Sequence, residues 1–210
     1  MKEKTKFFLK LLGVWHFATF LRSLPEIKKY KKEGFSGPAP YPVKMRIVRN
    51  YVTKYNLKLF VETGTYLGIT LRFIADLGIR CISIELSEKL YEMAQDQFKP
   101  YNNVTLIQGD SGVKIKEVLR TLNEPALFWL DGHYSEGITS TTDVHSPISA
   151  ELEAVLNHPI RQHVILIDDA KYFTGKNGYP HLDQLLKVVR ENGRYHSEVS
   201  TDIIRLLPIY

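Results

Sequence analysis

The sequence predicts an α/β fold in which a mostly parallel β-sheet carries helices on both faces. From residue 43 onward, short apolar segments alternate with longer segments of helical periodicity. Such alternation specifies a parallel sheet that is covered on both sides. The last two apolar segments are too close together for a crossover helix, so we expect an antiparallel C-terminal hairpin. A basic, apolar-rich segment precedes this pattern and is expected to form an N-terminal helical extension.

The expected elements follow one another without internal repeats or low-complexity tracts. Apolar runs of strand length occur at residues 58–62, 80–85, 103–107, 126–130, 162–167, 194–199 and 202–208. Stretches with helical spacing of apolar residues occur at residues 44–55, 68–77, 88–98, 112–122, 147–157 and 181–192. The whole pattern predicts one α/β domain.

The charge distribution divides the chain into residues 1–42, a basic amphipathic extension with a linker, and residues 43–210, the domain. Residues 1–58 carry 14 Lys and Arg against 3 Asp and Glu, a net charge of +11, whereas the rest carries 14 against 20, or −6. The amphipathic stretch 6–23 is too short and too often interrupted to span a bilayer. The segment GFSGPAPYP at 34–42 has the composition of a linker.

The basic extension predicts contact with an anionic surface. Residues 1–33 combine apolar and basic side chains, which suits the surface of an anionic membrane. Packing of this helix on its own domain or on a partner, and a solvated charged face, remain the alternatives.

Two further features bear on the cellular location. No small-residue cleavage site follows the apolar stretch, which argues against a secretory signal. The single cysteine, Cys81, lies in an apolar run and excludes a disulfide framework, and a lone buried thiol suits a reducing compartment. We therefore expect a cytoplasmic protein that the extension can hold on the cytoplasmic face of a membrane.

The end of the first strand reads VETGTYLG and has the glycine spacing of a nucleotide-binding turn. A dinucleotide fingerprint needs a middle glycine that lets the backbone touch a pyrophosphate, but Thr65 and Tyr66 follow Gly64 here. S-adenosylmethionine (SAM) has no phosphate and does not need this approach. The Glu62 carboxylate can also attract the ammonium group of SAM. A plain strand–turn–helix junction, in which Gly64 and Gly68 are structural, is the alternative.

The next two strand ends also carry acidic side chains. Glu85 ends the second strand, 23 residues after Glu62. A carboxylate at this strand end can accept hydrogen bonds from both ribose hydroxyls, in SAM as in NAD, and a solvated acid is the alternative. The third strand ends in LIQGDSG, where Asp110 can receive the adenine amino group. Ser111 either contacts the same cofactor or N-caps the following helix.

Three aspartates are expected to converge from the fourth and fifth strand ends. Asp131 follows the run LFWL, and Asp168 and Asp169 follow VILI. Neighbouring carboxylates repel one another unless a cation is present. Ligation by oxygen alone favours Mg²⁺, with Mn²⁺ or Ca²⁺ as alternatives. A cap of the following turn explains one of these aspartates, but less easily all three.

This ordered set of motifs resembles the class I SAM-dependent methyltransferases. The matching positions are Glu62, Gly64, Gly68, Glu85, Gly109-Asp110, Asp131 and Asp168-Asp169. The three aspartates are similar to the metal ligands of the metal-dependent O-methyltransferases, both catechol-type enzymes and macrocin-type enzymes that act on sugar hydroxyls. The resemblance covers roughly residues 58–170 in motifs, and the chain to its C-terminus in layout. It implies a Rossmann-like methyltransferase sheet.

The resemblance also implies a role for each site residue. The implied SAM contacts are Glu62, Gly64, Thr65, Tyr66, Gly68, Glu85, Asp110 and Ser111. The implied metal ligands are Asp131, Asp168 and Asp169. The chain departs from the family pattern at Tyr66, which replaces the usual middle glycine, and at Tyr134, where the catechol-type enzymes place a lysine.

His133 is the candidate for the catalytic base. Macrocin-type enzymes can carry a basic group just after the first metal aspartate, and His133 lies two residues after Asp131. A metal that binds two neighbouring oxygens lowers the pKa of a sugar hydroxyl, and a histidine can then take the proton near neutral pH. A supporting hydrogen bond or a surface position is the alternative role for His133. His145 is a weaker candidate, and the loop 134–146 is expected to line the acceptor site.

The sequence therefore predicts a SAM-dependent, Mg²⁺-dependent O-methyltransferase that acts on a sugar, a glycan or another small hydroxylated acceptor. The alternative is a non-catalytic SAM- or nucleotide-binding module with a membrane- or partner-binding arm, which the acids at five strand ends disfavour. Tyr66 disfavours an NAD oxidoreductase. A nucleic-acid methylase is disfavoured because the sequence DGHY after the fourth strand lacks an apolar platform for a flipped base.

Overall fold

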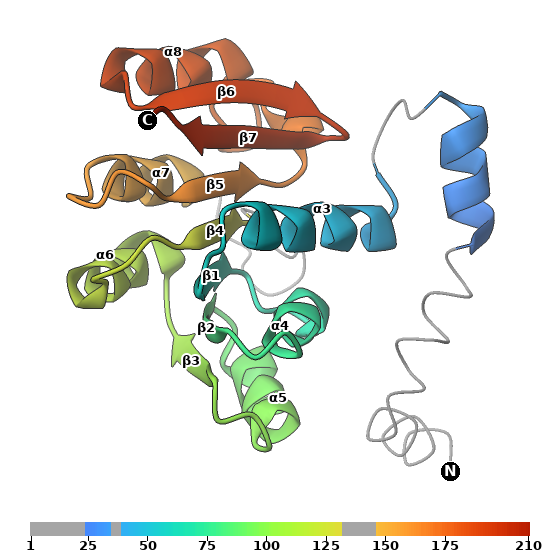
Figure 1. Ribbon diagram of the computed structural model, residues 1–210, viewed down its shortest axis with the longest axis vertical. Helices are drawn as coiled ribbons and strands as arrows, with labels where there is room; N and C mark the ends of the chain where they lie inside the picture. The colour runs from blue at the N-terminus through green and yellow to red at the C-terminus, as the bar shows by residue number, and fades with distance from the viewer. Residues whose placement is uncertain (1–23, 35–38, 132–145) are drawn as a thin grey trace.

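The computed structural model describes residues 24–34, 39–131 and 146–210. A seven-stranded sheet forms its centre, with the strand order β3-β2-β1-β4-β5-β7-β6 (Figure 1). The strands are β1 (Leu59–Thr63), β2 (Arg80–Glu85), β3 (Val104–Gln108), β4 (Leu127–Leu130), β5 (Val164–Ile167), β6 (Tyr195–Ser200) and β7 (Ile203–Pro208).

The strand pairings confirm the predicted topology. The pairs β1–β2, β2–β3, β1–β4 and β4–β5 are parallel. Strand β7 is antiparallel to both β5 and β6, so β6 and β7 form the expected C-terminal hairpin. Because the five parallel strands share one direction, their carboxyl ends lie along one edge of the sheet, where open α/β sheets bind ligands.

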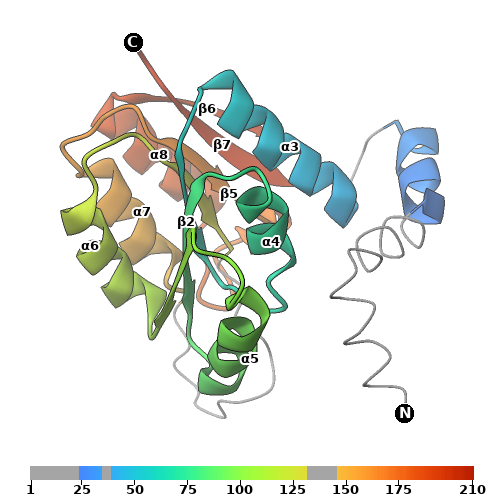
Figure 2. The same ribbon diagram turned by 60° about the horizontal axis from the view of Figure 1, so that its bottom comes forward.

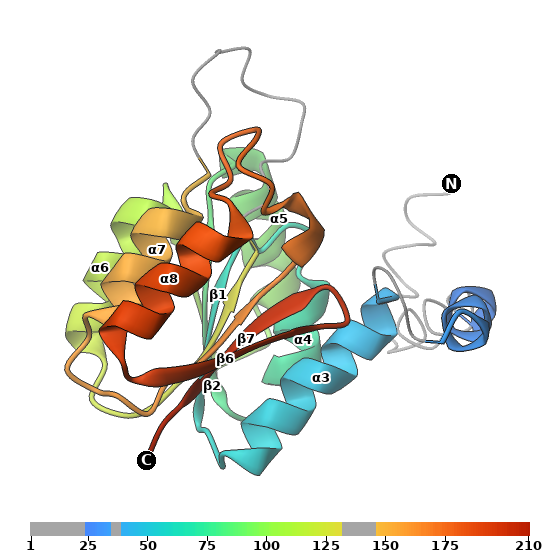
Figure 3. The same cartoon turned by 90° about the horizontal axis from the view of Figure 1, so that it is seen from above.

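Helices cover both faces of the sheet, as predicted. The helices α3 (Tyr41–Lys54), α4 (Ile69–Ala75) and α5 (Glu88–Phe98) lie on one face (Figure 3). The helices α6 (Ser111–Thr121), α7 (Ile148–Leu156) and α8 (Leu182–Asn192) lie on the other. A short 3₁₀ helix, η1 (Ala170–Tyr172), follows β5 and was not predicted. Residues 24–32 form another helix, which stands outside these two layers in Figures 1 and 3.

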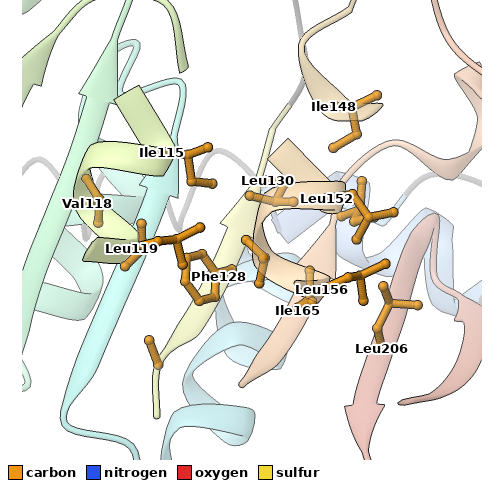
Figure 4. Close-up of a cluster of buried hydrophobic side chains, with 14 of the residues drawn as sticks. Ile115, Val118, Leu119, Phe128, Leu130, Ile148, Leu152, Leu156, Ile165 and Leu206 are labelled. Carbon is orange, nitrogen blue, oxygen red and sulfur yellow. The ribbon is translucent and has the colours of Figure 1, made fainter. Parts of the chain in front are cut away.

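The apolar runs of the central strands supply a core on each side of the sheet. Along β4, Phe128 and Leu130 pack with α6 and α7, whereas Leu127 and Trp129 pack on the opposite face. Figure 4 shows the first of these clusters between the sheet and the helices α6 and α7. Because successive strand residues point to opposite faces, a strand that is buried on both faces must be apolar throughout. The first polar side chains therefore come where β4 and β5 end.

The largest boundary difference is at the start of α3. The helix was expected from residue 44 but begins at Tyr41, inside the segment predicted as a linker. Proline is tolerated in the first turn of a helix because the N–H that it lacks would be unpaired there, and Pro42 occupies this turn. The domain division at residues 42 and 43 stays a prediction, and the whole stretch 6–23 lies outside the described residues, as do residues 35–38.

Two other observations concern the expected location. Within the described residues, no helix is long and apolar enough to cross a membrane. The Cys81 side chain is fully buried, as expected, and burial raises the pKa of its thiol to about 12.

Candidate functional site

The turn between β1 and α4 depends on its two glycines. Gly64 has φ +83°, and a Cβ atom there would lie 3.1 Å from the carbonyl oxygen of Asp131. Gly68 has φ +67°, and its Cβ would lie 2.6 Å from a ring carbon of Phe98. Both positions therefore need glycine for the left-handed backbone and for the close approach of a neighbour. The turn runs tightly between the ends of β4 and α5.

Tyr66 adopts a left-handed backbone conformation in this turn. Its φ is +47°, in the left-handed region that residues other than glycine rarely enter. The side chain is 58% exposed and projects away from the core. The turn therefore carries an aromatic ring on its outer surface.

Glu85 holds this turn from the neighbouring strand. Its Oε2 accepts the backbone N–H of Tyr66 at 2.8 Å, and its Oε1 accepts that of Ser87 at 2.9 Å. A carboxylate offers about four acceptor positions, so these two bonds leave positions for further donors. Glu85 thus organises the turn and can still receive ribose hydroxyls.

Glu62 lies beneath the same turn in a hydroxyl network. Ser83 donates to Glu62 Oε2 at 2.7 Å, and the hydroxyls of Ser83 and Thr65 lie 2.7 Å apart. Because the single Ser83 hydrogen goes to Glu62, Thr65 is the donor to Ser83. Burial raises the pKa of Glu62 to about 8, and the nearby Asp131 carboxylate adds to the rise. A cation placed against Glu62 would favour its charged form.

Asp110, rather than Ser111, caps the helix α6. Asp110 Oδ1 accepts the backbone N–H of Gly112 at 2.7 Å, so the alternative role of Ser111 as the N-cap is wrong, and its contact with the cofactor stays a prediction. A carboxylate is the better acceptor for the N–H groups at a helix start. Ser111 is the first helical residue, and its side chain hydrogen-bonds to Glu151 on α7.

Glu151 is a buried acid that the sequence reasoning missed. It has no exposed surface, and Thr63 donates to its Oε2 at 3.4 Å. Burial raises its pKa to about 7, and the carboxylates of Asp110 and Asp131 contribute to the rise. A charged residue on the apolar stripe of the segment ISAELEAVL was the signal that could have found it.

The three aspartates come together as predicted. Each of Asp131, Asp168 and Asp169 offers one carboxylate oxygen, and these oxygens all lie within 4.8 Å of one another. Asp169 has φ +54°, a left-handed conformation that aspartate tolerates better than most residues. Its backbone N–H donates to Asp168 Oδ1 at 2.8 Å, so the turn after β5 directs both side chains to the site.

A lysine from α3 enters the same cluster. The Lys44 Nζ atom lies 2.6 Å from Asp168 Oδ1 and 2.9 Å from Asp169 Oδ1. Burial lowers the pKa of Lys44, but the two carboxylates outweigh burial and hold it above its usual value. Burial raises the pKa of Asp168 to about 7, and Lys44 opposes that rise. The ammonium group therefore stays charged in the midst of the acids.

A second lysine approaches from the outer side. Lys171 lies 2.8 Å from Asp169 Oδ1 and 3.0 Å from Asp202 Oδ2. Neither lysine was predicted as a site residue. The spacing of Lys44, Val48 and Val52, one helical turn apart on the buried face of α3, was the signal for Lys44. His133, Tyr134 and His145 lie outside the described residues, so the predicted base stays a prediction.

No protein-family model matches the chain. The ribosomal RNA small subunit methyltransferase A of Syntrophus aciditrophicus (strain SB) is 26% identical over 156 residues. This match covers 65% of the present chain, and the chain spans about half the length of that curated relative, 55% of it.

Solved structures match over a larger part of the chain. The O-methyltransferase of Bacillus cereus, solved with S-adenosylhomocysteine (SAH), is 15% identical with a TM-score of 0.60, over 89% of this chain and 90% of that one. TomG from Streptomyces achromogenes, an O-methyltransferase of tomaymycin synthesis solved with SAM, is 13% identical with a TM-score of 0.59, over 87% and 86%. The chain has the class I SAM-dependent methyltransferase fold. In this methyltransferase fold, the acids predicted from the sequence lie at the carboxyl ends of parallel strands: Glu62, Glu85, Asp110, Asp131, Asp168 and Asp169.

Proposed function

We propose that the protein is a SAM-dependent O-methyltransferase that acts on a hydroxyl group of a sugar, a glycan or another small hydroxylated acceptor. The observation that carries the proposal is the meeting of Asp131, Asp168 and Asp169 beside the turn after β1. The fold supports it, because O-methyltransferases share this architecture over most of the chain. The acceptor class rests on the likeness of the aspartates to those of macrocin-type enzymes.

The cofactor would bind along the ends of β1, β2 and β3. Glu62 would face the ammonium group of SAM, which favours the charged form of a carboxyl group that burial otherwise keeps neutral near pH 7. Glu85 would accept the ribose hydroxyls with the oxygen positions that the amides of Tyr66 and Ser87 leave open. Asp110 would receive the adenine amino group with the acceptor positions that its capping bond to Gly112 leaves open.

Methyl transfer from SAM is an in-line displacement that breaks the methyl carbon–sulfur bond and forms a carbon–oxygen bond. The protein must hold the acceptor oxygen close to the methyl group and remove its proton. We assign the proton to His133, which follows Asp131 by two residues. Loss of a general base costs about 10²–10⁴-fold in rate.

The predicted divalent cation meets an obstacle in this site. The donor set suits it chemically, since Mg²⁺ takes carboxylate oxygens at about 2.0–2.1 Å. However, the Lys44 ammonium already contacts two of the three aspartates. The site with Lys44 in this position does not fit a divalent ion bound to the same oxygens, so no step of the proposal passes through a metal. Whether Mg²⁺, Mn²⁺ or Ca²⁺ binds stays a prediction that chelation tests.

A screen of methyl acceptors tests the proposal. Purified protein is incubated with SAM labelled on its methyl group and with sugars, lipid-linked glycans, catechols or ribosomal RNA, and label in each product is counted. We expect transfer to a hydroxylated small molecule or glycan that falls by about 10²–10⁴-fold in His133→Ala but not in His145→Ala. Transfer to RNA alone, which the curated relative's name suggests, would contradict the acceptor class. SAH binding without transfer to any acceptor would favour the non-catalytic SAM-binding module.

The basic extension is a second part of the proposal. We propose that residues 1–33 place the enzyme on an anionic membrane surface, because this segment carries 9 Lys and Arg against 3 Glu, a net charge of +6. Co-sedimentation with anionic and with neutral vesicles tests it. The full chain should sediment only with anionic vesicles, and removal of residues 1–33 should abolish this. Equal sedimentation of both chains would favour packing or self-association of the extension.

A further inference from the structure

Lys44 is a cation of the chain itself that pairs with two of the three clustered aspartates. Its Nζ atom contacts Asp168 and Asp169 at 2.6 and 2.9 Å. The three residues are 8%, 9% and 8% exposed, in the order Lys44, Asp168, Asp169. Contacts this short between buried groups differ from surface ion pairs, in which two long side chains move freely in water. The lysine is therefore part of the site.

The helix α3 fixes where this ammonium group lies. Tyr41, in the first turn, bonds through its hydroxyl to that of Thr70 on α4 at 2.9 Å. Figure 2 shows α3 and α4 side by side on the same face of the sheet. On its buried face, α3 packs Met45, Val48 and Val52 into the core that covers β4 and β5. Because both the hydroxyl contact and the apolar face anchor α3, Lys44 projects into the cluster from a rigid support.

An ion and this ammonium group would compete for the same oxygens. A divalent cation coordinated by Asp168 and Asp169 would lie at about 2.0–2.1 Å from the oxygens that Lys44 contacts. Two cations that share these oxygens repel one another. Lys171 adds a second positive charge beside Asp169. Lys44 and Lys171 thus place two positive charges beside the three aspartates, although Asp202 shares Lys171. Part of the repulsion that calls for a cation is already balanced.

We infer that the Lys44 ammonium group takes the place of the Mg²⁺ ion that the sequence predicts, and that it keeps divalent ions out of the aspartate cluster. An ammonium group has three N–H donors. Two of them serve Asp168 and Asp169 among the described residues, and the third can hold an acceptor oxygen. Lys44 would then be a positioning residue for the acceptor, and this role rests on the proposed function. The exclusion of metal ions by Lys44 does not depend on the proposed function.

Mn²⁺ binding to the purified full chain, followed by electron paramagnetic resonance, tests the inference without any need for an acceptor. We expect weak binding to the wild type, and binding tighter by about 10- to 100-fold in Lys44→Met, the scale on which neighbours of a metal site change its affinity. Lys44→Arg keeps the charge and should bind as weakly as the wild type. Lys114→Met removes a partly exposed lysine that pairs with Glu117 and is the matched control.

Several outcomes would overturn the inference. Equal Mn²⁺ affinity in the wild type and Lys44→Met would show that the lysine does not guard the site. Absence of binding in both, with SAH binding intact, would show that the aspartates are no metal site once the lysine is gone. If the Lys44 variants do not fold, the Mn²⁺ affinity of the wild-type protein tests the inference by itself, because micromolar affinity contradicts it. SAH titration of each variant separates these results from a failure of the proposed function.

Discussion

The backbone N–H of Tyr66 donates to the Glu85 carboxylate at 2.8 Å, and this bond joins the turn after β1 to the end of β2. The turn holds a tyrosine in a left-handed conformation that costs about 1–2 kcal/mol. The charge-assisted bond to Glu85 offsets part of this cost. Glu85 is therefore both a support for the turn and a candidate ligand for the cofactor.

Replacement of Glu85 should weaken SAH binding more than it weakens the fold. In Glu85→Gln, the side-chain NH₂ group would face one of the two N–H donors, and the charge that favours ribose hydroxyls is lost. Hydrogen bonds to charged groups contribute about 1.5–3 kcal/mol, so calorimetry should show affinity lower by about 10- to 150-fold. Glu88→Gln, an exposed change at the start of the next helix, should leave the affinity unaltered. Equal affinity in both variants would remove Glu85 from the cofactor site.

Alanine substitutions at two glycines with similar backbone conformations distinguish the cost of backbone strain from the cost of a steric clash. Gly68 and Gly78 have φ values of +67° and +75°, but only Gly68 has neighbours within 4 Å of an added Cβ. Gly78→Ala should cost about 1–2 kcal/mol in unfolding free energy. Gly68→Ala should cost about 1–3 kcal/mol more, since Phe98 must move. Urea denaturation measures both, and equal losses would mean that the turn yields to the extra methyl group.

Glu151 should make stability fall as the pH rises. Its pKa is about 7 in the folded protein against 4.5 for an ordinary glutamate side chain. Its contribution is therefore fully present below about pH 4.5 and is lost as the pH rises through about 7. Relative to the wild type, Glu151→Gln should gain about 2 kcal/mol in unfolding free energy between pH 5 and pH 8. Glu153 is exposed on the same helix, so Glu153→Gln should gain no unfolding free energy over this pH range. If the unfolding free energies of both variants change with pH in the same way, Glu151 lies in a more polar environment than this account assumes.

Much of the fold follows from the sequence because each strand of the centre is apolar and short. The run LFWL is buried on both faces, which alternation with helices predicts without any tertiary information. The hairpin of β6 and β7 follows from the short connection between them. The start of α3 at Tyr41 was missed because proline and glycine dominate residues 34–42, although proline is compatible with a first helical turn.

The site was predictable where it depends on strand ends and unpredictable where it depends on helix packing. Asp131, Asp168 and Asp169 had to converge once β4 and β5 were adjacent. Lys44 and Glu151 reach the site from helices, and only the packing of α3 and α7 on the sheet decides which charged residue is turned inward. The spacing of these two residues relative to apolar neighbours predicts that they are buried, but it does not predict which side chain each one contacts.

Equilibrium titration of the full chain with SAH, with NAD as the comparison ligand, tests the central claim most directly, because it needs no knowledge of the acceptor. We expect single-site SAH binding that weakens in both Glu62→Gln and Glu85→Gln, and no binding of NAD. Binding of NAD without SAH, or SAH binding that neither substitution changes, would contradict the placement of SAM at the ends of β1 and β2.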